Sequence, residues 1–212
     1  MRILAINGSH RGRKGFTHFL INKVFKGAGE AGAECEEVVL AKTKMNYCIS
    51  CGKCNSKNHY LKCIFEGKDD VKSVFDKMAS SDLIIHATPI YIFNMSAMMK
   101  TFLDRTYSTG DLFDLKLSKS GLFFHHLNHD ISSKPFVPLI CCDNMEKETP
   151  KNVISFFKTF SLFQDAPQTG LLVRNTGGFI GHGKKPDMET LFPKIAASFK
   201  AFEKAGFELA TN

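Results

Sequence analysis

Four of the seven cysteines in this 212-residue sequence lie within sixteen positions. They form a C-x2-C-x2-C run, and the fourth cysteine follows after eight intervening residues. Thiolates this close together can hold one iron–sulfur cube, because neighbouring cysteines in such a run point to a common centre. A zinc site with four thiolate ligands and a set of reactive thiols without metal are the competing interpretations. The residues concerned are Cys48, Cys51, Cys54 and Cys63.

A second group of chemically capable residues lies in the loop 7–17, which follows a short apolar segment. Its glycines let backbone N–H groups turn inward, its hydroxyls are donors, and the start of the next helix adds partial positive charge. With an arginine as well, the loop favours a phosphate monoester; a solvated turn with a threonine as ordinary N-cap is the alternative. It has neither the closing Gly-Lys-Ser/Thr of a P-loop nor a G-x-G-x-x-G pattern. The candidate residues are Ser9, Arg11, Gly15, Phe16 and Thr17.

Two further groups are weaker candidates. An H-H-x-x-H group could bind a metal, but only Asp130 is near enough in the sequence to complete a ligand set, so a solvated or interface loop is favoured. The segment 141–144 follows a predicted strand and should approach the ligand side of the sheet, with Cys141 as a buried structural thiol. The histidines of the first group are His125, His126 and His129.

These groups are positioned by short apolar segments that alternate with amphipathic ones along the whole chain. Such alternation predicts an α/β fold with a doubly wound parallel sheet and helices on both faces. Ligands bind such sheets beyond the carboxyl ends of the strands, which is where the loop 7–17 falls. We expect a single domain over 1–212 with a Cys-rich insertion at about 47–65. The predicted strands are 2–7, 35–40, 82–88, 135–142 and 169–174, and the predicted helices are 17–31, 68–79, 96–107, 150–163 and 187–205.

Composition narrows the class of protein. Hydrophobic residues make up 43% and charged residues 23%, as in a globular chain. The net charge of +7 favours anionic ligands, but Lys and Arg are scattered without a nucleic-acid-binding pattern, so no nucleic acid is expected. No apolar stretch approaches the roughly 20 residues of a membrane span, and the N-terminus reads as a strand, so we expect a cytoplasmic protein away from membranes. Seven cysteines in such a chain favour metal or redox chemistry over disulfides.

Residues 88–105 resemble a family signature. They match the T-P-x-Y…S-x-x-M-K-x-F-L-D-R pattern of the NAD(P)H-dependent FMN reductases and iron–sulfur flavoproteins, which have a flavodoxin-like fold. Gly8, Ser9, Arg11 and Thr17 match the family's G-S-x-R…T phosphate loop, with His10 where the family often has Pro. The resemblance covers roughly the first half of the chain. It implies a flavodoxin-like, five-stranded parallel sheet in the order 2-1-3-4-5.

The resemblance also implies roles. The loop 7–17 would hold the phosphate of FMN, and the segment after the third strand would border the isoalloxazine ring. The four cysteines lie between the second strand and the second helix, as in the family, and would hold a [4Fe-4S] cluster. For Tyr91 and Phe93 the alternative is a plain core position, and for Lys100, Asp104 and Arg105 a structural role is favoured. The implied ring contacts are Pro89, Ile90, Tyr91, Ile92, Phe93 and Asn94.

The function implied is that of an FMN-dependent oxidoreductase that transfers electrons, with a cluster near the flavin and NAD(P)H as a candidate reductant. No catalytic acid or base is expected, because the chemistry belongs to the cofactor. Small-molecule or protein redox partners and a homo-oligomer, dimer or tetramer, are implied as well. The alternatives are a cluster-free NAD(P)H-dependent FMN or quinone reductase and a metal-binding or regulatory module on the same fold.

Overall fold

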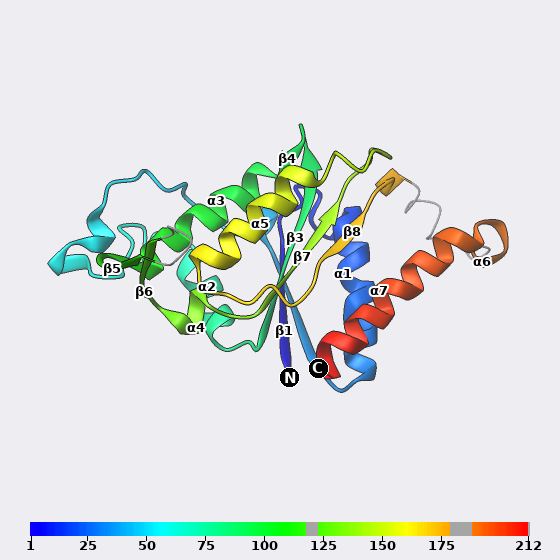
Figure 1. Cartoon of the computed structure of the whole chain (residues 1–212), viewed down its shortest axis with the longest axis horizontal. Coiled ribbons are helices and arrows are strands. Elements are labelled where there is room, and N and C mark those ends of the chain that lie inside the picture. The colour runs from blue at the N-terminus through cyan, green and yellow to red at the C-terminus, as the bar shows by residue number, and fades with distance from the viewer. Residues whose placement is uncertain (118–122, 179–187, 212) are drawn as a thin grey trace.

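The centre of the molecule is a twisted parallel sheet (Figure 1). The structure is a computed structural model that describes residues 1–117, 123–178 and 188–211. Its five parallel strands run in the order β2-β1-β3-β7-β8, which confirms the predicted order of a doubly wound fold. The strands are β1 (Arg2–Asn7), β2 (Glu34–Val39), β3 (Leu83–Tyr91), β7 (Phe136–Cys141) and β8 (Leu172–Arg174).

Helices cover both faces of the sheet (Figure 1). Alternate residues of β1 point to opposite faces, so Ile3 and Ala5 join one core while Leu4 and Ile6 join the other. The first core includes α1 (Phe16–Glu30) and α7 (Pro193–Thr211). The second core includes α2 (Val71–Ala79), α3 (Ala97–Arg105) and α5 (Lys151–Phe163). No described helix is both long and apolar enough to cross a membrane.

Short elements connect this framework. Two of them, α4 (His129–Ser132) and α6 (Met188–Leu191), are single α-helical turns, and the others are 3-10 turns. They let the chain change direction where no amphipathic repeat is long enough for a full helix. The 3-10 turns are η1 (Gly12–Lys14), η2 (Leu40–Lys42), η3 (Lys53–Asn55), η4 (Lys57–His59) and η5 (Thr106–Thr109).

The structure differs from the sequence prediction in two hairpins. A short antiparallel strand β4 (Asn94–Met95) pairs with the end of β3, which therefore runs past the predicted limit at Thr88. The segment 111–133, which contains none of the predicted strands or helices, contributes β5 (Gly110–Leu117) and β6 (Phe123–Leu127), a separate two-stranded sheet. Apolar and polar residues do not alternate strictly in this segment, and the pairing carries an irregularity between Asp111 and Leu115, so the strand signal is weak.

The last helix also differs. The sequence pattern predicts a helix over 187–205 that the following Gly206 would end, but α7 begins at Pro193 and continues through Gly206 to Thr211. Gly206 lies inside the helix because α7 crosses α1 closely there. A Cβ atom at Gly206 would lie 1.9 Å from the carbonyl oxygen of Val24. Here a glycine marks close helix packing and not a helix terminus.

A buried histidine gives the core a dependence on pH. His86 lies on β3 among phenylalanine rings, with Phe157 stacked on it at 5.8 Å between ring centroids. Burial lowers the pKa of His86 from 6.5 to about 3, because the imidazolium would be formed without water. Near pH 6 the unfolded chain then binds a proton at this histidine and the folded chain does not. The contribution of His86 to the free energy of unfolding is therefore complete above that pH range and falls as the pH falls.

We expect the free energy of unfolding to fall by about 2 kcal/mol between pH 7 and pH 5 on account of this residue alone. His86→Phe keeps a flat ring without a titrating group, so the variant should lack that part of the pH dependence. Urea unfolding of both proteins across this pH range measures the difference. If the free energy of unfolding changes equally with pH in the two proteins, His86 is not the group responsible.

Candidate functional site

The first loop, residues 8–17, lies at the carboxyl ends of β1 and β3. The Gly8 N–H donates to the carbonyl of Ala87 at 2.8 Å, which ties the loop to β3. The Ser9 N–H donates to Oδ1 of Asn7 at 2.9 Å, and the Arg11 N–H donates to Oγ of Ser9 at 3.3 Å. β1 has β2 on one side and β3 on the other, so the loop starts at the strand where the order reverses.

The start of α1 forms a cradle above this loop. Gly15 is the N-cap residue and provides no side-chain cap, and the first turn of α1 contains no acidic residue. A Cβ atom at Gly15 would lie 2.7 Å from Oγ of Ser9, so only glycine lets the helix start approach Ser9 so closely. Ser9 and Thr17 are buried, and the guanidinium of Arg11 lies over the ring of Phe16 at 5.5 Å. Free helix N–H groups, hydroxyls and a cation thus meet in one place and fit a phosphate monoester.

Thr17 is not the N-cap of α1, as the alternative of a solvated turn would require. It is the second residue of α1, and Gly15 holds the N-cap position with extended backbone. The structure thus brings together all five residues that the sequence singled out in this loop. Their role toward a phosphate stays a prediction.

The β3–β4 hairpin, residues 88–95, is strained and exposed at its tip. Ile92 and Phe93 both have left-handed backbone, with φ of 46° and 61°, and Ile92 is 91% exposed. A left-handed β-branched residue costs on the order of 1–3 kcal/mol and persists only where the surrounding structure holds it, often at a ligand site. Tyr91 and Phe93 are also exposed, so the alternative that they are plain core residues is wrong.

The hairpin and the first loop belong to one site. The rings of His10 and Tyr91 have centroids 5.8 Å apart. Just beyond the hairpin, Oγ of Ser96 donates to the carbonyl of Gly8 at 2.6 Å and also caps α3. Of the remaining predicted ring contacts, Pro89 and Ile90 are half-buried and Asn94 is exposed.

A second candidate site collects the four cysteines. One small pocket is lined by all four of them together with Arg105, Tyr107 and Ser108. It lies between the Cys loop, which we define as residues 44–70, and the carboxyl end of α3. Gly52 has left-handed backbone with φ of 68° and turns the chain inside the C-x2-C-x2-C run. Cys54 is buried, Cys48 and Cys63 are half-buried, and Cys51 is exposed.

The four thiols influence one another electrostatically. Burial raises the pKa of Cys54, and the nearby Cys63, Cys51 and Cys48 raise it further. Burial also raises the pKa of Tyr107, with Cys54 and Cys48 adding to the effect. Among the described residues, no three His, Cys, Asp or Glu side chains form a ligand set for a single metal ion.

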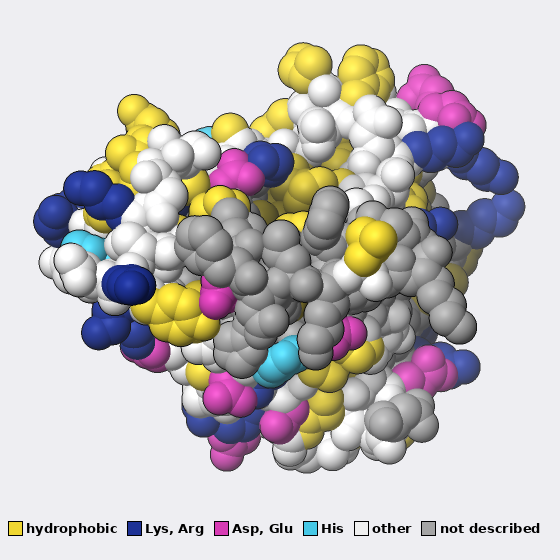
Figure 2. Space-filling view, turned by 60° about the vertical axis from the view of Figure 1, so that its left-hand side comes forward, with side chains coloured by type: hydrophobic (Ala, Val, Ile, Leu, Met, Phe, Trp, Pro, Cys, Tyr) yellow, Lys and Arg dark blue, Asp and Glu magenta, His cyan; other side chains and the backbone are white. Residues whose placement is uncertain are grey.

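The Cys loop is exposed at its outer surface. Tyr47 and Ile49 are among the exposed large hydrophobic residues. Figure 2 turns this side of the molecule toward the viewer, and hydrophobic side chains stand exposed there beside Lys and Arg.

Arg105 is the pocket residue whose role the sequence did not reveal. Lys100 pairs with Asp104 at i, i+4, as expected of a structural pair on α3. Arg105 instead turns inward, is almost wholly buried and forms an ion pair with Asp69. Nothing in the local pattern F-L-D-R distinguishes an inward arginine from a surface one, since its partner lies 36 residues away.

The segment 141–144, one of the weaker candidates, begins beside the hairpin of the first site. Cys141 is buried at the carboxyl end of β7, in register with Pro89 of β3, and burial raises its pKa to about 12. Cys142 donates to Oδ1 of Asn175 at 3.1 Å. His129 is exposed in α4, whereas the side chains of His125 and His126 lie outside the described residues.

Comparison with known proteins gives a family match over the part of the chain that contains both sites. The model of the family "NADPH-dependent FMN reductase" matches residues 1–124. An iron–sulfur flavoprotein of Archaeoglobus fulgidus is 33% identical over 121 residues, which are 57% of this chain and 52% of that protein. An iron–sulfur flavoprotein of Methanocaldococcus jannaschii is 33% identical over 105 residues, half of each chain. The chain thus spans about half the length of the curated relatives that it matches.

Solved structures resemble the whole chain in fold. An FMN-dependent NADH-azoreductase from Bacillus anthracis, in complex with FMN, has a TM-score of 0.66 at 12% identity and covers 99% of both chains. An NAD(P)H:quinone oxidoreductase from Methanothermobacter marburgensis has a TM-score of 0.61 at 15% identity and covers 99% of this chain and 98% of its own. At such low identity the likeness shows the flavodoxin-like fold alone.

Proposed function

Since this chain belongs to the NADPH-dependent FMN reductase family, we propose that it binds FMN between the first loop and the β3–β4 hairpin and acts as an FMN-dependent oxidoreductase. The observation that carries the proposal is the joined site. A glycine cradle at the start of α1 lies beside a strained, exposed, apolar hairpin, and the two are connected through Ser96 and Gly8. A phosphate fits the first part and a flat aromatic ring fits the second.

Bound FMN would supply the hydride and electron chemistry. The hydroxyls of Ser9 and Thr17 and the first N–H groups of α1 would donate to the phosphate, and Arg11 would balance its charge. Tyr91, together with the hairpin tip, would border the ring and exclude water from it. No proton transfer by a side chain is required, so the chain's residues bind and orient the cofactor.

The four cysteines of the pocket would hold a [4Fe-4S] cluster. The relatives named iron–sulfur flavoproteins support this proposal, as does the convergence of four thiols on one pocket. Zinc sites with four thiolate ligands usually combine two separated C-x-x-C pairs, whereas three of these four cysteines form one C-x2-C-x2-C run, which favours a cluster over zinc.

The second candidate is a cluster-free NAD(P)H-dependent reductase of flavins or quinones. The match to the NADPH-dependent FMN reductase family favours it, because that activity requires only the flavin site. In both versions NAD(P)H is the candidate donor, and the acceptor is a small molecule or a redox protein. The exposed apolar tip at Ile92 would suit cover by a second subunit of a homo-oligomer.

Thr17→Val tests the phosphate contact, because it removes a hydroxyl donor and keeps the shape of the side chain. Losing a hydrogen bond to a charged group should weaken FMN binding by about 1.5–3 kcal/mol, or roughly ten- to a hundredfold. Riboflavin has no phosphate, so its affinity should not change. Fluorescence titration of the apoprotein with both flavins measures the two values. An FMN affinity equal to that of the wild type would refute the assignment.

A further inference from the structure

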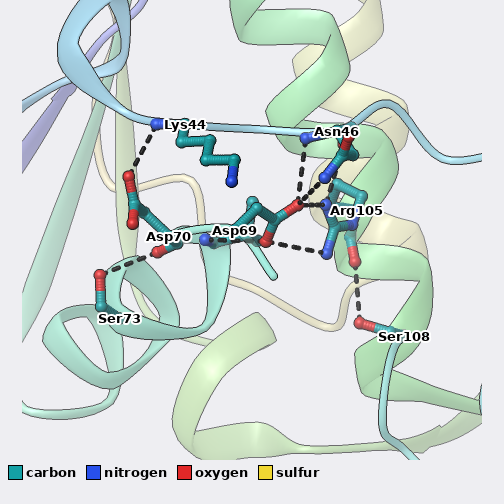
Figure 3. Close-up of polar contacts among 8 residues, drawn as sticks. Lys44, Asn46, Asp69, Asp70, Ser73, Arg105 and Ser108 are labelled. Atoms are coloured by element: carbon teal, nitrogen blue, oxygen red, sulfur yellow. Dashed lines mark hydrogen bonds and ion pairs between the residues drawn. The ribbon is translucent and has the colours of Figure 1, made fainter. Parts of the chain in front are cut away.

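The base of the Cys loop is closed by a buried ion pair (Figure 3). The side chains of Asp69 and Arg105 are 0% and 2% exposed, and both Nη groups of Arg105 reach the Asp69 carboxylate. Nη1 of Arg105 also donates to the carbonyl of Asn46 at 2.8 Å. Asn46 precedes the first cysteine of the pocket and Asp69 follows the last. One side chain of α3 thus holds both ends of the loop.

Further hydrogen bonds tie the two ends to each other (Figure 3). The backbone N–H of Asn46 donates to Oδ2 of Asp69 at 3.0 Å, and that of Lys44 donates to Oδ2 of Asp70 at 2.7 Å. The Asp70 N–H returns a bond to the Lys44 carbonyl at 2.9 Å. Burial alone would raise the pKa of Asp69, but the bonds from Arg105, Asn46 and Val71 outweigh it and hold the pKa below its usual value. The carboxylate is thus charged at neutral pH.

Arg105 also belongs to the wall of the cysteine pocket. Its buried Nε has no hydrogen-bond partner among the residues that the structure describes. A buried, unpartnered N–H costs stability, and a buried ion pair adds little stability compared with apolar packing. The unpartnered Nε–H and the buried ion pair both lie at the pocket wall that Arg105 shares with four thiols. This placement points to a role of Arg105 at that pocket.

We propose that Arg105 is a positioning residue for the cysteine pocket, where its Nη groups hold the loop closed and its Nε–H and positive charge act on the thiolates and the cluster that they hold. This inference rests on the proposed cluster for its second part only. Hydrogen bonds to cluster sulfurs and nearby positive charge make an anionic cluster easier to reduce. We call the ion pair of Asp69 and Arg105 the clamp. At the other end of α3, Ser96 contacts the first loop, so this nine-residue helix connects the clamp to that loop over about 14 Å.

The first arm of the test uses the iron-free protein. Without the clamp the loop should open, so R105Q should speed alkylation of the buried Cys54 by N-ethylmaleimide about tenfold or more, as read by peptide mass spectrometry. R105K has one compact donor group in place of the planar fork, so it should also speed the reaction. K100Q is the matched control, because it removes a positive charge from the exposed face of the same helix and should leave the rate unchanged.

The second arm uses protein reconstituted anaerobically with iron and sulfide. R105Q should lower the reduction potential of the cluster, and R105K, which keeps the charge, should return it most of the way to the wild-type value. A purely structural arginine would not separate the two variants in this way. Bound FMN and circular dichroism report on folding, and where R105Q is not folded, R105K decides the first arm.

If Cys54 is alkylated no faster in a folded variant at position 105 than in K100Q, Arg105 does not hold the loop closed. If the reduction potentials of the cluster are equal in R105Q, K100Q and the wild type, Arg105 does not act on the cluster. Wild-type protein that binds no iron overturns the second part together with the proposed cluster, while the first arm still decides the clamp.

Discussion

Alanine at any one of Cys48, Cys51, Cys54 and Cys63 is expected to remove nearly all of the bound iron. Each thiol lines the same pocket, and a cluster bound through four thiolates loses a direct ligand in each variant. The loss of metal affinity should exceed the roughly 10- to 100-fold that the loss of a ligand's hydrogen-bond partner costs. Iron content and visible absorbance after anaerobic reconstitution measure the effect. Flavin content should largely survive, because the first loop and the hairpin lie outside the Cys loop.

Cys35→Ala is the matched control for this panel. Cys35 is a half-buried thiol on β2, outside the pocket, so its removal should leave iron content unchanged. If single alanine variants keep their iron, or if only the control loses it, the four cysteines are not one ligand set. Zinc in place of iron in the native protein would also contradict the account of this pocket.

Gly27→Ala is expected to cause the largest loss of stability, because the added methyl group has no space. A Cβ atom at Gly27 would lie 1.7 Å from the carbonyl oxygen of Glu203, where α1 crosses α7. A backbone atom cannot move aside as a side-chain end can, so the two helices must separate. We expect a loss of about 3 kcal/mol or more in the free energy of unfolding, the upper end of the usual cost of overpacking. Urea unfolding measures it.

Gly29→Ala is the control on the same helix. No atom lies within 4 Å of a Cβ built at Gly29, so this change should be neutral or stabilise by about 0.5 kcal/mol through helix propensity. Should Gly27→Ala unfold like the wild type, the close crossing of α1 and α7 would be incorrect.

The doubly wound parallel sheet could be predicted because each apolar strand is followed by an amphipathic helix, which is a local pattern. The order of its strands was implied by the family resemblance, and right-handed crossovers leave few alternatives to it. The β3–β4 hairpin could not be predicted in this way. Its turn has Ile92 and Phe93 in left-handed backbone, whereas turn signals rest on Gly, Asn and Asp. Gly206 misled the prediction for a similar reason, since a packing glycine and a capping glycine look alike in sequence.

The candidate sites were predictable to the extent that their residues are neighbours in sequence. The first loop and the cysteine run each lie in one short segment, so their residue types already define a chemistry. The clamp at Arg105 joins three segments far apart in the chain, and no spacing rule connects Asn46, Asp69 and Arg105. The same holds for the contact between His10 and Tyr91, which depends on the order of β1 and β3 in the sheet.

Identification of the flavin held by the native protein tests the central claim most directly. The protein is purified without air, its flavin is released by denaturation, and the flavin is identified by mass and quantified against the chain. We predict FMN in an amount equimolar with the chain, because the cradle at Ser9, Gly15 and Thr17 accommodates one phosphate monoester. A protein that holds FAD alone, or that neither contains FMN nor binds it when FMN is added, would contradict the account.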